Sequence, residues 1–318
     1  MIYVEMRGRL GNQLFKYAMA RKMQIQRHNK DEICMSYDKV YSEKSKYSGW
    51  TNDLINFNIT NSCFEYKDKK NFVFKNGNNF CKLYYVKNKI LQKLFNDDIK
   101  FNKYLLSKQS IFNRHGFYQS PKGFIPFSES GEKNIFLFGS FQSSRYFDSI
   151  RSVLIKEFTP IIPRLEKNKK LYDIIENNES VCVSIRRGDY ISVPKFKKIY
   201  DICDLSYFIE AISIFNNILS NPKFIIFSDD IEWAKDQMSY MDNVFFEDGD
   251  DPVWEKLRLM YSCKNFVLSN SSFSWWAQYL SRNPSKKVIS PQKWYRDGHF
   301  SDLIENDFIR LNTGVKES

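Results

Sequence analysis

Ser180-Val-Cys-Val-Ser-Ile-Arg-Arg-Gly-Asp-Tyr190 is the most informative stretch of this chain. The short apolar run at 181–185 is rich in β-branched side chains, which predicts a buried strand. It ends abruptly in Arg186, Arg187, a glycine and Asp189. In open α/β sheets, ligands bind in the crevice at the carboxyl ends of the strands. A strand that brings two guanidinium groups to this edge is suited to hold a phosphate.

The two arginines are expected to point to opposite faces, because successive side chains of a strand alternate. Arg186 continues the face of Ser184, and Arg187 continues the face of Ile185. We expect one arginine to contact the ligand and the other to pair with Asp189 or another carboxylate. A surface cluster of Arg and Asp that only caps the strand is the alternative interpretation.

Length and charge bound the number of domains and the class of partner. A chain of 318 residues suits two domains of ordinary size. It carries 48 Lys and Arg against 37 Asp and Glu, a net charge of +11. This excess favours anionic partners, such as a nucleotide, a phosphorylated lipid or a nucleic acid, without choosing among them.

The cysteines, the histidines and the first residues of the chain indicate the cellular compartment and argue against some kinds of metal or catalytic site. The six cysteines show no C-x-x-C pairing, which indicates free thiols in a reducing compartment. Three histidines argue against a His-rich metal site or a His-based triad. The first residues lack the order of a signal peptide, and no apolar run approaches the roughly 18 residues of a membrane span. We expect a cytoplasmic protein, with association at the inner face of the membrane left open.

Apolar runs alternate with helical spacings along the chain, which predicts an α/β fold with parallel strands. A first strand at 2–6, a turn with Gly8 and Gly11 and a helix at 12–24 resemble the start of a Rossmann-like half. Two prolines in Thr159–Pro163 mark the preferred boundary, which gives domains at 1–160 and 161–318. In the second half, strands are predicted by the apolar runs at 181–185, 223–228, 244–246 and 265–268.

The segment from about 40 to 130 has no clear period. Within it, Lys82–Lys108 places many lysines among Leu, Ile, Phe and Tyr. Such a stretch can lie on an anionic membrane surface. A solvated helical face is the alternative.

Polar clusters follow three of the predicted strands, at 186–189, 228–230 and 269–272. Parallel strands share one carboxyl edge, so the clusters are expected to meet there. The arginines suit a diphosphate, and a carboxylate at Asp229 or Asp230 can accept hydrogen bonds from a ribose or from guanine N–H groups. The Ser-Asn-Ser-Ser turn offers hydroxyls and backbone N–H groups at the start of a helix, where an anion is favoured. Together they predict a nucleotide diphosphate laid along the sheet edge.

Each cluster also has a purely structural interpretation. Ser228 and Asp229 are common helix N-caps, and a Ser-Asn-Ser-Ser loop often only turns the chain. Asn12, after the glycine turn, either reaches a ligand or caps the helix; this turn is neither a Walker A loop nor G-x-G-x-x-G. Asp248 and Asp250 could hold Mg²⁺ or Mn²⁺. An acidic, solvated turn is the preferred interpretation, since the cationic strand end already supplies neutralising charge.

Four motifs in order resemble those of a known family. Gly8-Arg-Leu-Gly-Asn-Gln-Leu-Phe-Lys-Tyr-Ala18 resembles the opening of glycosyltransferase family 11, the α-1,2-fucosyltransferases, especially the bacterial ones. Arg186-Arg-Gly-Asp-Tyr190 resembles the arginine motif that α-1,2-, α-1,6- and protein O-fucosyltransferases share. Phe227–Asp230 and Ser269–Trp276 are similar to the two later motifs of the family.

The resemblance implies two Rossmann-like domains that face each other across a cleft, the GT-B arrangement. The N-terminal domain would be on the acceptor side, and the C-terminal domain would bind GDP-β-L-fucose with no metal or other cofactor. Arg186 would contact the departing diphosphate, and Asp189 would hold the motif. One departure is Ser184, which stands where the family usually has His. The expected contacts of GDP-fucose are Gly11, Asn12, Arg186, Arg187, Ser228, Asp229, Asp230, Asn270, Ser271, Ser272 and Phe273.

The predicted reaction is inverting transfer of L-fucose to the 2-hydroxyl of a galactose-type sugar, through an oxocarbenium-like transition state. The acceptor would be a galactose-containing oligosaccharide or a lipid-linked glycan, and no nucleic-acid partner is expected. One alternative is a fucosyltransferase that uses the same donor on another acceptor or hydroxyl. Another is a basic nucleotide- or nucleic-acid-binding protein without transferase activity.

Overall fold

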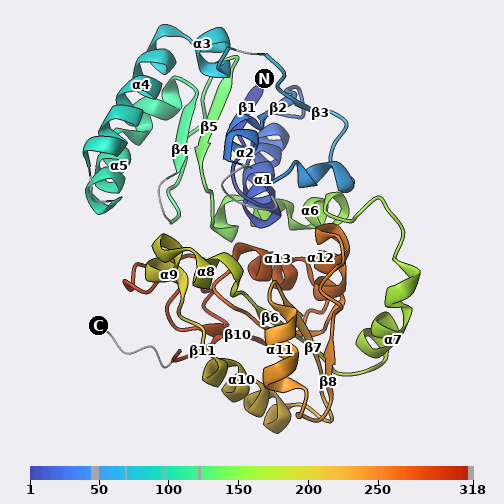
Figure 1. Cartoon of the computed structure of the whole chain (residues 1–318). Helices are drawn as coiled ribbons and strands as arrows, with labels where there is room; N and C mark the ends of the chain where they lie inside the picture. The colour runs from blue at the N-terminus through green and yellow to red at the C-terminus, as the bar shows by residue number, and fades with distance from the viewer. Residues whose placement is uncertain (44–49, 69, 96–97, 121–122, 314–318) are drawn as a thin grey trace. The chain divides into compact units, whose positions relative to one another are not determined.

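The computed structural model describes residues 1–43, 50–68, 70–95, 98–120 and 123–313. The chain divides into two compact units (Figure 1): unit 1 is Met1–Ile55 with Ile59–Leu154, and unit 2 is Asn56–Asn58 with Ile155–Ser318. The predicted boundary at residue 160 therefore lies inside unit 2. There Phe57 forms an isolated bridge with Pro160, and the backbone N–H of Asn58 donates to the carbonyl of Thr159 over 3.1 Å.

Unit 1 is built on a five-stranded parallel sheet with the order β3-β2-β1-β5-β4. Its strands are β1 (Ile2–Glu5), β2 (Ile33–Ser36), β3 (Cys63–Glu65), β4 (Phe117–Ser120) and β5 (Ile135–Gly139). Its α-helices are α1 (Leu10–Gln26), α2 (Asp38–Glu43), α3 (Phe72–Asn76), α4 (Asn79–Leu94) and α5 (Asp98–Arg114). Short 3₁₀ turns are η1 (Asp53–Asn56), η2 (Ser144–Tyr146) and η3 (Asp148–Ile150).

Unit 2 holds a six-stranded parallel sheet with the order β8-β7-β6-β9-β10-β11. Its strands are β6 (Ser180–Ile185), β7 (Lys223–Ser228), β8 (Val244–Phe246), β9 (Asn265–Val267), β10 (Val288–Pro291) and β11 (Ile309–Leu311). In chain order this is the 3-2-1-4-5-6 arrangement of dinucleotide-binding Rossmann sheets. The order reverses between β6 and β9, so the crevice that such sheets offer to ligands lies where these two strands end.

Helices connect the strands of this second sheet. They are α6 (Arg151–Glu157), which spans the boundary between the units, η4 (Glu166–Asn168), α7 (Lys169–Asn177), α8 (Gly188–Ser192), α9 (Pro194–Tyr200), α10 (Leu205–Ile218), α11 (Ile231–Met238), α12 (Val253–Ser262) and α13 (Ser272–Leu280). Every residue of β6 is buried, as expected for a central strand covered on both faces. Val181, Val183 and Ile185 pack with Phe208 and Phe215 of α10 in one cluster, which fixes where the strand ends.

The structure confirms the predicted α/β class with parallel sheets. The four strands predicted in the second half are found within one residue of their predicted ends. The described part of the stretch from 40 to 130, which has no clear period in the sequence, includes the helices α3 to α5. Their aromatic side chains form much of the core of unit 1. How the units face each other stays a prediction.

All six cysteines are free thiols. No helix in the described part of the chain is long and apolar enough to cross a membrane.

Candidate active site

The strand order of the second sheet places two polar segments at one edge of that sheet. Arg186 follows β6 directly, and Ser269 lies two residues after the end of β9. The two segments are joined at their start, because the N–H of Ser269 donates to the carbonyl of Ser184 over 3.1 Å. The sheet thus brings the arginine motif and the serine loop together, as the sequence predicted.

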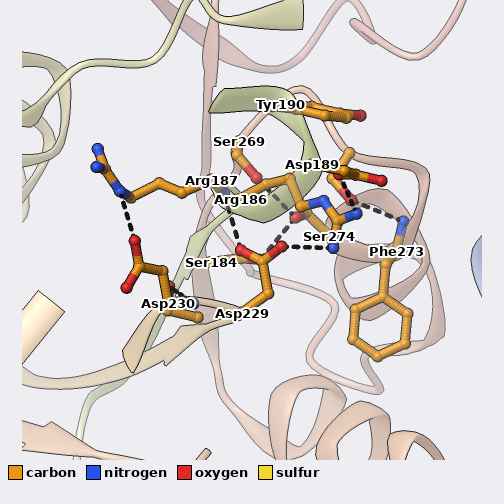
Figure 2. A network of polar contacts seen from close by, with 12 residues as sticks. Ser184, Arg186, Arg187, Asp189, Tyr190, Asp229, Asp230, Ser269, Phe273 and Ser274 are labelled. Carbon is orange, nitrogen blue, oxygen red and sulfur yellow. Dashed lines mark hydrogen bonds and ion pairs between the residues drawn. The ribbon is translucent and has the colours of Figure 1, made fainter. Parts of the chain in front are cut away.

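Arg186 is fixed between two carboxylates (Figure 2). Its Nη2 lies 2.5 Å from Oδ1 of Asp189, and its Nη1 lies 2.7 Å from Oδ2 of Asp229. Burial by itself lowers the pKa of this guanidinium, but the attraction of Asp229 and Asp189 exceeds that effect and raises it. The side chain is 17% exposed. Arg186 is therefore a permanently charged group with a set direction at the mouth of the crevice.

Arg187 extends away from Arg186 toward Asp230 (Figure 2). Its Nε lies 3.2 Å from Oδ2 of Asp230, and its Cζ lies 3.7 Å from the ring centroid of Trp233. The prediction that the two arginines point to opposite faces is confirmed. Both arginines pair with carboxylates, and which of them contacts the ligand stays a prediction.

The register of β6 and β7 explains this double pairing. Ile185 lies opposite Ser228, the last residue of β7. The residues that follow are two arginines on one strand and two aspartates on the other. Each arginine therefore meets the aspartate that leaves its strand on the same face.

Asp229 holds more than one group of the motif. Besides the ion pair with Arg186, its Oδ1 accepts a 2.8 Å hydrogen bond from the backbone N–H of Arg187. Gly188 permits this approach, because a Cβ there would lie 3.1 Å from Cγ of Asp229 and closer still to Oδ2. Asp229 thus holds the loop after β6 in place. The sequence alone could not distinguish this role from ligand binding or helix capping.

Neither Ser228 nor Asp229 caps the following helix. Helix α11 begins at Ile231, and Asp230 occupies its N-cap position. The hydroxyl of Ser228 accepts a 3.0 Å hydrogen bond from the N–H of Asp230. Ser228 is buried and shapes the turn, whereas the Asp230 side chain is 42% exposed.

The serine loop divides into a structural part and an accessible part. The amide of Asn270 is buried and donates to the carbonyls of Tyr200 and Trp294 over 2.9 and 3.0 Å. The side chain of Asn270 therefore anchors the loop, and its contact with a ligand stays a prediction. Ser271 caps α13, with its Oγ accepting from the N–H of Phe273 over 3.3 Å. Half-buried residues follow at Ser272 and Phe273.

Ser184 belongs to a buried cluster of three hydroxyls. Its Oγ lies 2.6 Å from that of Ser274, which in turn lies 3.1 Å from the Oγ of Ser269. Figure 2 draws these serines together with the arginine motif. The residue that replaces the family's histidine is 6% exposed and committed to this cluster.

Tyrosines that the sequence did not single out line the same motif. The ring of Tyr190 stacks on that of Tyr200 with 4.8 Å between centroids, and the Cζ of Arg186 lies 5.3 Å from the Tyr190 centroid. The hydroxyl of Tyr190 donates to the carbonyl of Asn270 over 3.3 Å. Burial raises the pKa of this phenol, which keeps it protonated and able to donate. The position of Tyr190 directly after Asp189 was the feature of the sequence that could have indicated this role.

Gly11 and Asn12 lie in unit 1, in the first turn of α1. Gly11 is buried, and Oδ1 of Asn12 accepts a 2.9 Å hydrogen bond from the amide of Gln142. Their place in one site with Arg186 stays a prediction.

One carboxylate of the Asp-x-Asp turn forms an ion pair with a lysine. Asp250 pairs with Lys167 over 2.5 Å, and this hydrogen-bonded lysine lowers the pKa of the carboxyl. No group of three metal-ligating His, Cys, Asp or Glu side chains occurs among the residues described.

Comparison with known proteins extends the similarity beyond the motifs. Residues 1–312 match the family model described as Glycosyl transferase family 11. An α-1,2-colitosyltransferase of Escherichia coli is 30% identical over 303 residues, 92% of this chain and 92% of that protein. The O-antigen biosynthesis glycosyltransferase WbnK of Escherichia coli is 27% identical over 98% of this chain and 100% of its own length.

A solved structure shares the fold. Fucosyltransferase NodZ from Bradyrhizobium has a TM-score of 0.51 at 13% identity, covering 88% of this chain and 93% of that one. A family match that spans nearly the whole chain, over a Rossmann sheet with charged groups at its switch point, leads to one conclusion: the chain belongs to glycosyltransferase family 11.

Proposed function

We propose that this enzyme transfers L-fucose from GDP-β-L-fucose to the 2-hydroxyl of a galactose-type acceptor, with inversion at the anomeric carbon. Membership of family 11 supports the reaction class. A galactoside 2-α-L-fucosyltransferase of Caenorhabditis elegans is 30% identical over 191 residues, 53% of this chain and 49% of that protein. The observation that carries the proposal is Arg186, held by two carboxylates at the carboxyl end of β6.

The clamped guanidinium keeps donors for a diphosphate. A guanidinium has five N–H groups, two on each terminal nitrogen. Asp189 engages Nη2 and Asp229 engages Nη1, so each terminal nitrogen has a second N–H to offer. These N–H groups are oriented before the substrate arrives. Negative charge that grows on departing GDP meets a fixed donor, which is the usual source of the largest catalytic effect.

Net charge at the motif does not attract GDP. Two arginines and the carboxylates of Asp189, Asp229 and Asp230 sum to −1. Binding must therefore depend on the direction of the N–H groups. The start of α13, after the N-cap Ser271, adds backbone N–H groups and the positive end of a helix dipole at the neighbouring strand end.

We assign Asp189 the task of orienting Arg186, and Arg187 that of holding Asp230 at the edge of the crevice. The side chain of Asp230 is more exposed than that of Asp229 and is available to accept hydrogen bonds from a ribose or a guanine. Asp250 is engaged by Lys167, so we expect transfer to proceed without a divalent cation.

A second donor is favoured by one specific observation, the colitosyltransferase similarity over 92% of both chains. Colitose is L-fucose without the 3-hydroxyl, so GDP-colitose would use the same diphosphate contacts and the same leaving group. The two donors differ only at the 3-position of the sugar, so side chains near that position would decide between them.

The test is an assay of purified protein with GDP-fucose and GDP-colitose against a panel of β-galactosides, with and without EDTA. We expect transfer to galactose from at least one donor, unchanged by EDTA, with an α-1,2 linkage by NMR. Transfer to a different hydroxyl would replace the proposed linkage. Loss of transfer in EDTA would implicate Asp248 and Asp250 as metal ligands, and binding of oligonucleotides without any transfer would refute the enzyme.

A further inference from the structure

Helix α4 carries a second apolar face that the core of unit 1 does not use. Cys81, Tyr85 and Asn88 are buried on its inner side. On another side, four large apolar residues recur at spacings of three and four, which in a helix form one continuous stripe. Their exposed fractions are high: Leu83 64%, Val86 42%, Ile90 53% and Leu94 72%. One exposed leucine is ordinary, but an aligned set of four is not.

Lysines border this stripe on both sides. At 3.6 residues per turn, Lys82, Lys89 and Lys93 fall along one edge and Lys87 along the other. The segment 79–94 contains no Asp or Glu. The charged residues that border the apolar stripe within this helix are therefore all lysines.

We infer that α4 docks on an anionic phospholipid surface, with the four apolar side chains of the stripe entering the interface. Amphipathic helices that lie in the plane of the membrane interface carry Leu-type residues on one face and Lys or Arg around that face. Lysine stems lie along apolar surface while their ammonium groups stay at the level of lipid phosphates. The absence of acidic side chains in the segment fits a partner with negative charge over its whole surface.

The surroundings of α4 allow such contact. Helix α4 lies beside α5, and both are in the part of unit 1 next to β4 (Figure 1). Helix α5 adds an exposed Leu106 and an exposed Lys103. The surface is separate in sequence from the arginine motif, so this inference does not depend on the choice of donor or acceptor.

The experiment is co-flotation of the purified full chain with vesicles of phosphatidylcholine alone or with one third phosphatidylglycerol. We expect binding to the anionic vesicles and its loss at high salt. Ile90→Gln with Leu94→Gln is expected to weaken binding about tenfold or more. The matched control is Ile218→Gln, an exposed apolar residue of α10 outside the stripe, which is expected to bind like wild type.

Two further double variants test how much the positive charge of the lysines contributes to vesicle binding. Lys87→Ala with Lys93→Ala should weaken binding about fivefold for each lysine at low salt. Lys169→Ala with Lys170→Ala removes the same charge from α7 and should have little effect. All variants should keep the far-ultraviolet spectrum and the transferase activity on soluble acceptors.

Three outcomes would overturn the inference. They are no binding to anionic vesicles, equal binding to neutral ones, and binding that the stripe variants leave unchanged. If wild type instead forms a dimer that the Ile90→Gln variant dissociates, without binding vesicles, the stripe is an interface between two copies of the chain.

Discussion

A Cβ atom on Gly188 would lie 3.1 Å from Cγ of Asp229, so these two residues meet with no room for a side chain at position 188. The contact joins the loops after β6 and β7. Through it, Asp229 reaches both the guanidinium of Arg186 and the backbone N–H of Arg187. The glycine of the arginine motif thus makes room for a carboxylate that lies 41 residues away in sequence.

Gly188→Ala should displace Asp229 and loosen Arg186. We expect kcat/KM for transfer to fall about 10²-fold, the size of effect seen when one preorganised donor is lost. The control is Gly131→Ala, because a Cβ at Gly131 meets nothing within 4 Å. Steady-state kinetics of both variants decide the matter, and a Gly188→Ala enzyme as active as the control would contradict the proposed role of the contact.

Arg186→Ala should lower kcat by about 10²–10³ if the guanidinium stabilises departing GDP. Arg186→Lys should recover only part of this loss, because an ammonium cannot contact Asp189, Asp229 and a phosphate with the geometry of a fork. Arg164→Ala, which removes an exposed partner of Glu176, is the control. Near-normal turnover of Arg186→Ala would exclude the residue from catalysis.

Asp229→Asn should be more harmful than Asp230→Asn. The first substitution removes a charge that faces the half-buried Arg186, whereas the second affects a more exposed pair 3.2 Å apart. We expect Asp229→Asn to lose about 1–3 kcal/mol of unfolding free energy and to bind GDP weakly. Asp230→Asn should keep its stability and change only GDP affinity. Calorimetry with GDP and urea unfolding separate these effects, and the opposite ranking would reverse the two roles.

Lys16 should make the stability of the protein depend on pH. Burial lowers its pKa from 10.5 to about 8, although nearby Glu5 acts against this. Between pH 8 and 10.5 the unfolded chain binds a proton that the folded chain does not. The contribution of Lys16 to the unfolding free energy therefore rises with pH across this window, by up to about 3 kcal/mol.

Lys16→Met should remove this rise. The variant is expected to gain stability relative to wild type near pH 7, and the gain should shrink toward pH 10.5. Urea unfolding at several pH values measures the difference. Lys30→Met, at an exposed position, should follow the wild-type curve at every pH. Parallel curves for wild type and Lys16→Met would show that Lys16 is not the titrating group.

Local sequence determined a large part of this fold. The β-branched run before Arg186 has the composition of a strand covered on both faces, and the apolar runs at 223–228 and 265–268 carry the same signal. Their alternation with helical spacings leaves a parallel sheet as the solution. Because ligands of such sheets bind at the carboxyl ends, the position of the charged residues could also be predicted.

The partners of those residues could not. Asp229 pairs with Arg186 because of the register between β6 and β7, which depends on packing across the whole sheet. The same holds for Asn270, whose amide donates to the carbonyls of Tyr200 and Trp294. These residues lie 70 and 24 positions away from it in the sequence. Composition alone cannot separate an amide that faces a ligand from one that anchors a loop.

Helix α4 shows the division most clearly. Its sequence places apolar residues around much of the helix, and nothing local states which of them the core will take. Tertiary packing buries Tyr85 and leaves Leu83 and Ile90 exposed. Local side-chain chemistry was therefore enough to predict the strands, their parallel arrangement and the position of the charged residues at the sheet edge. The ion pairs and the exposed stripe depend on contacts between segments far apart in the chain, so they became visible in the folded structure alone.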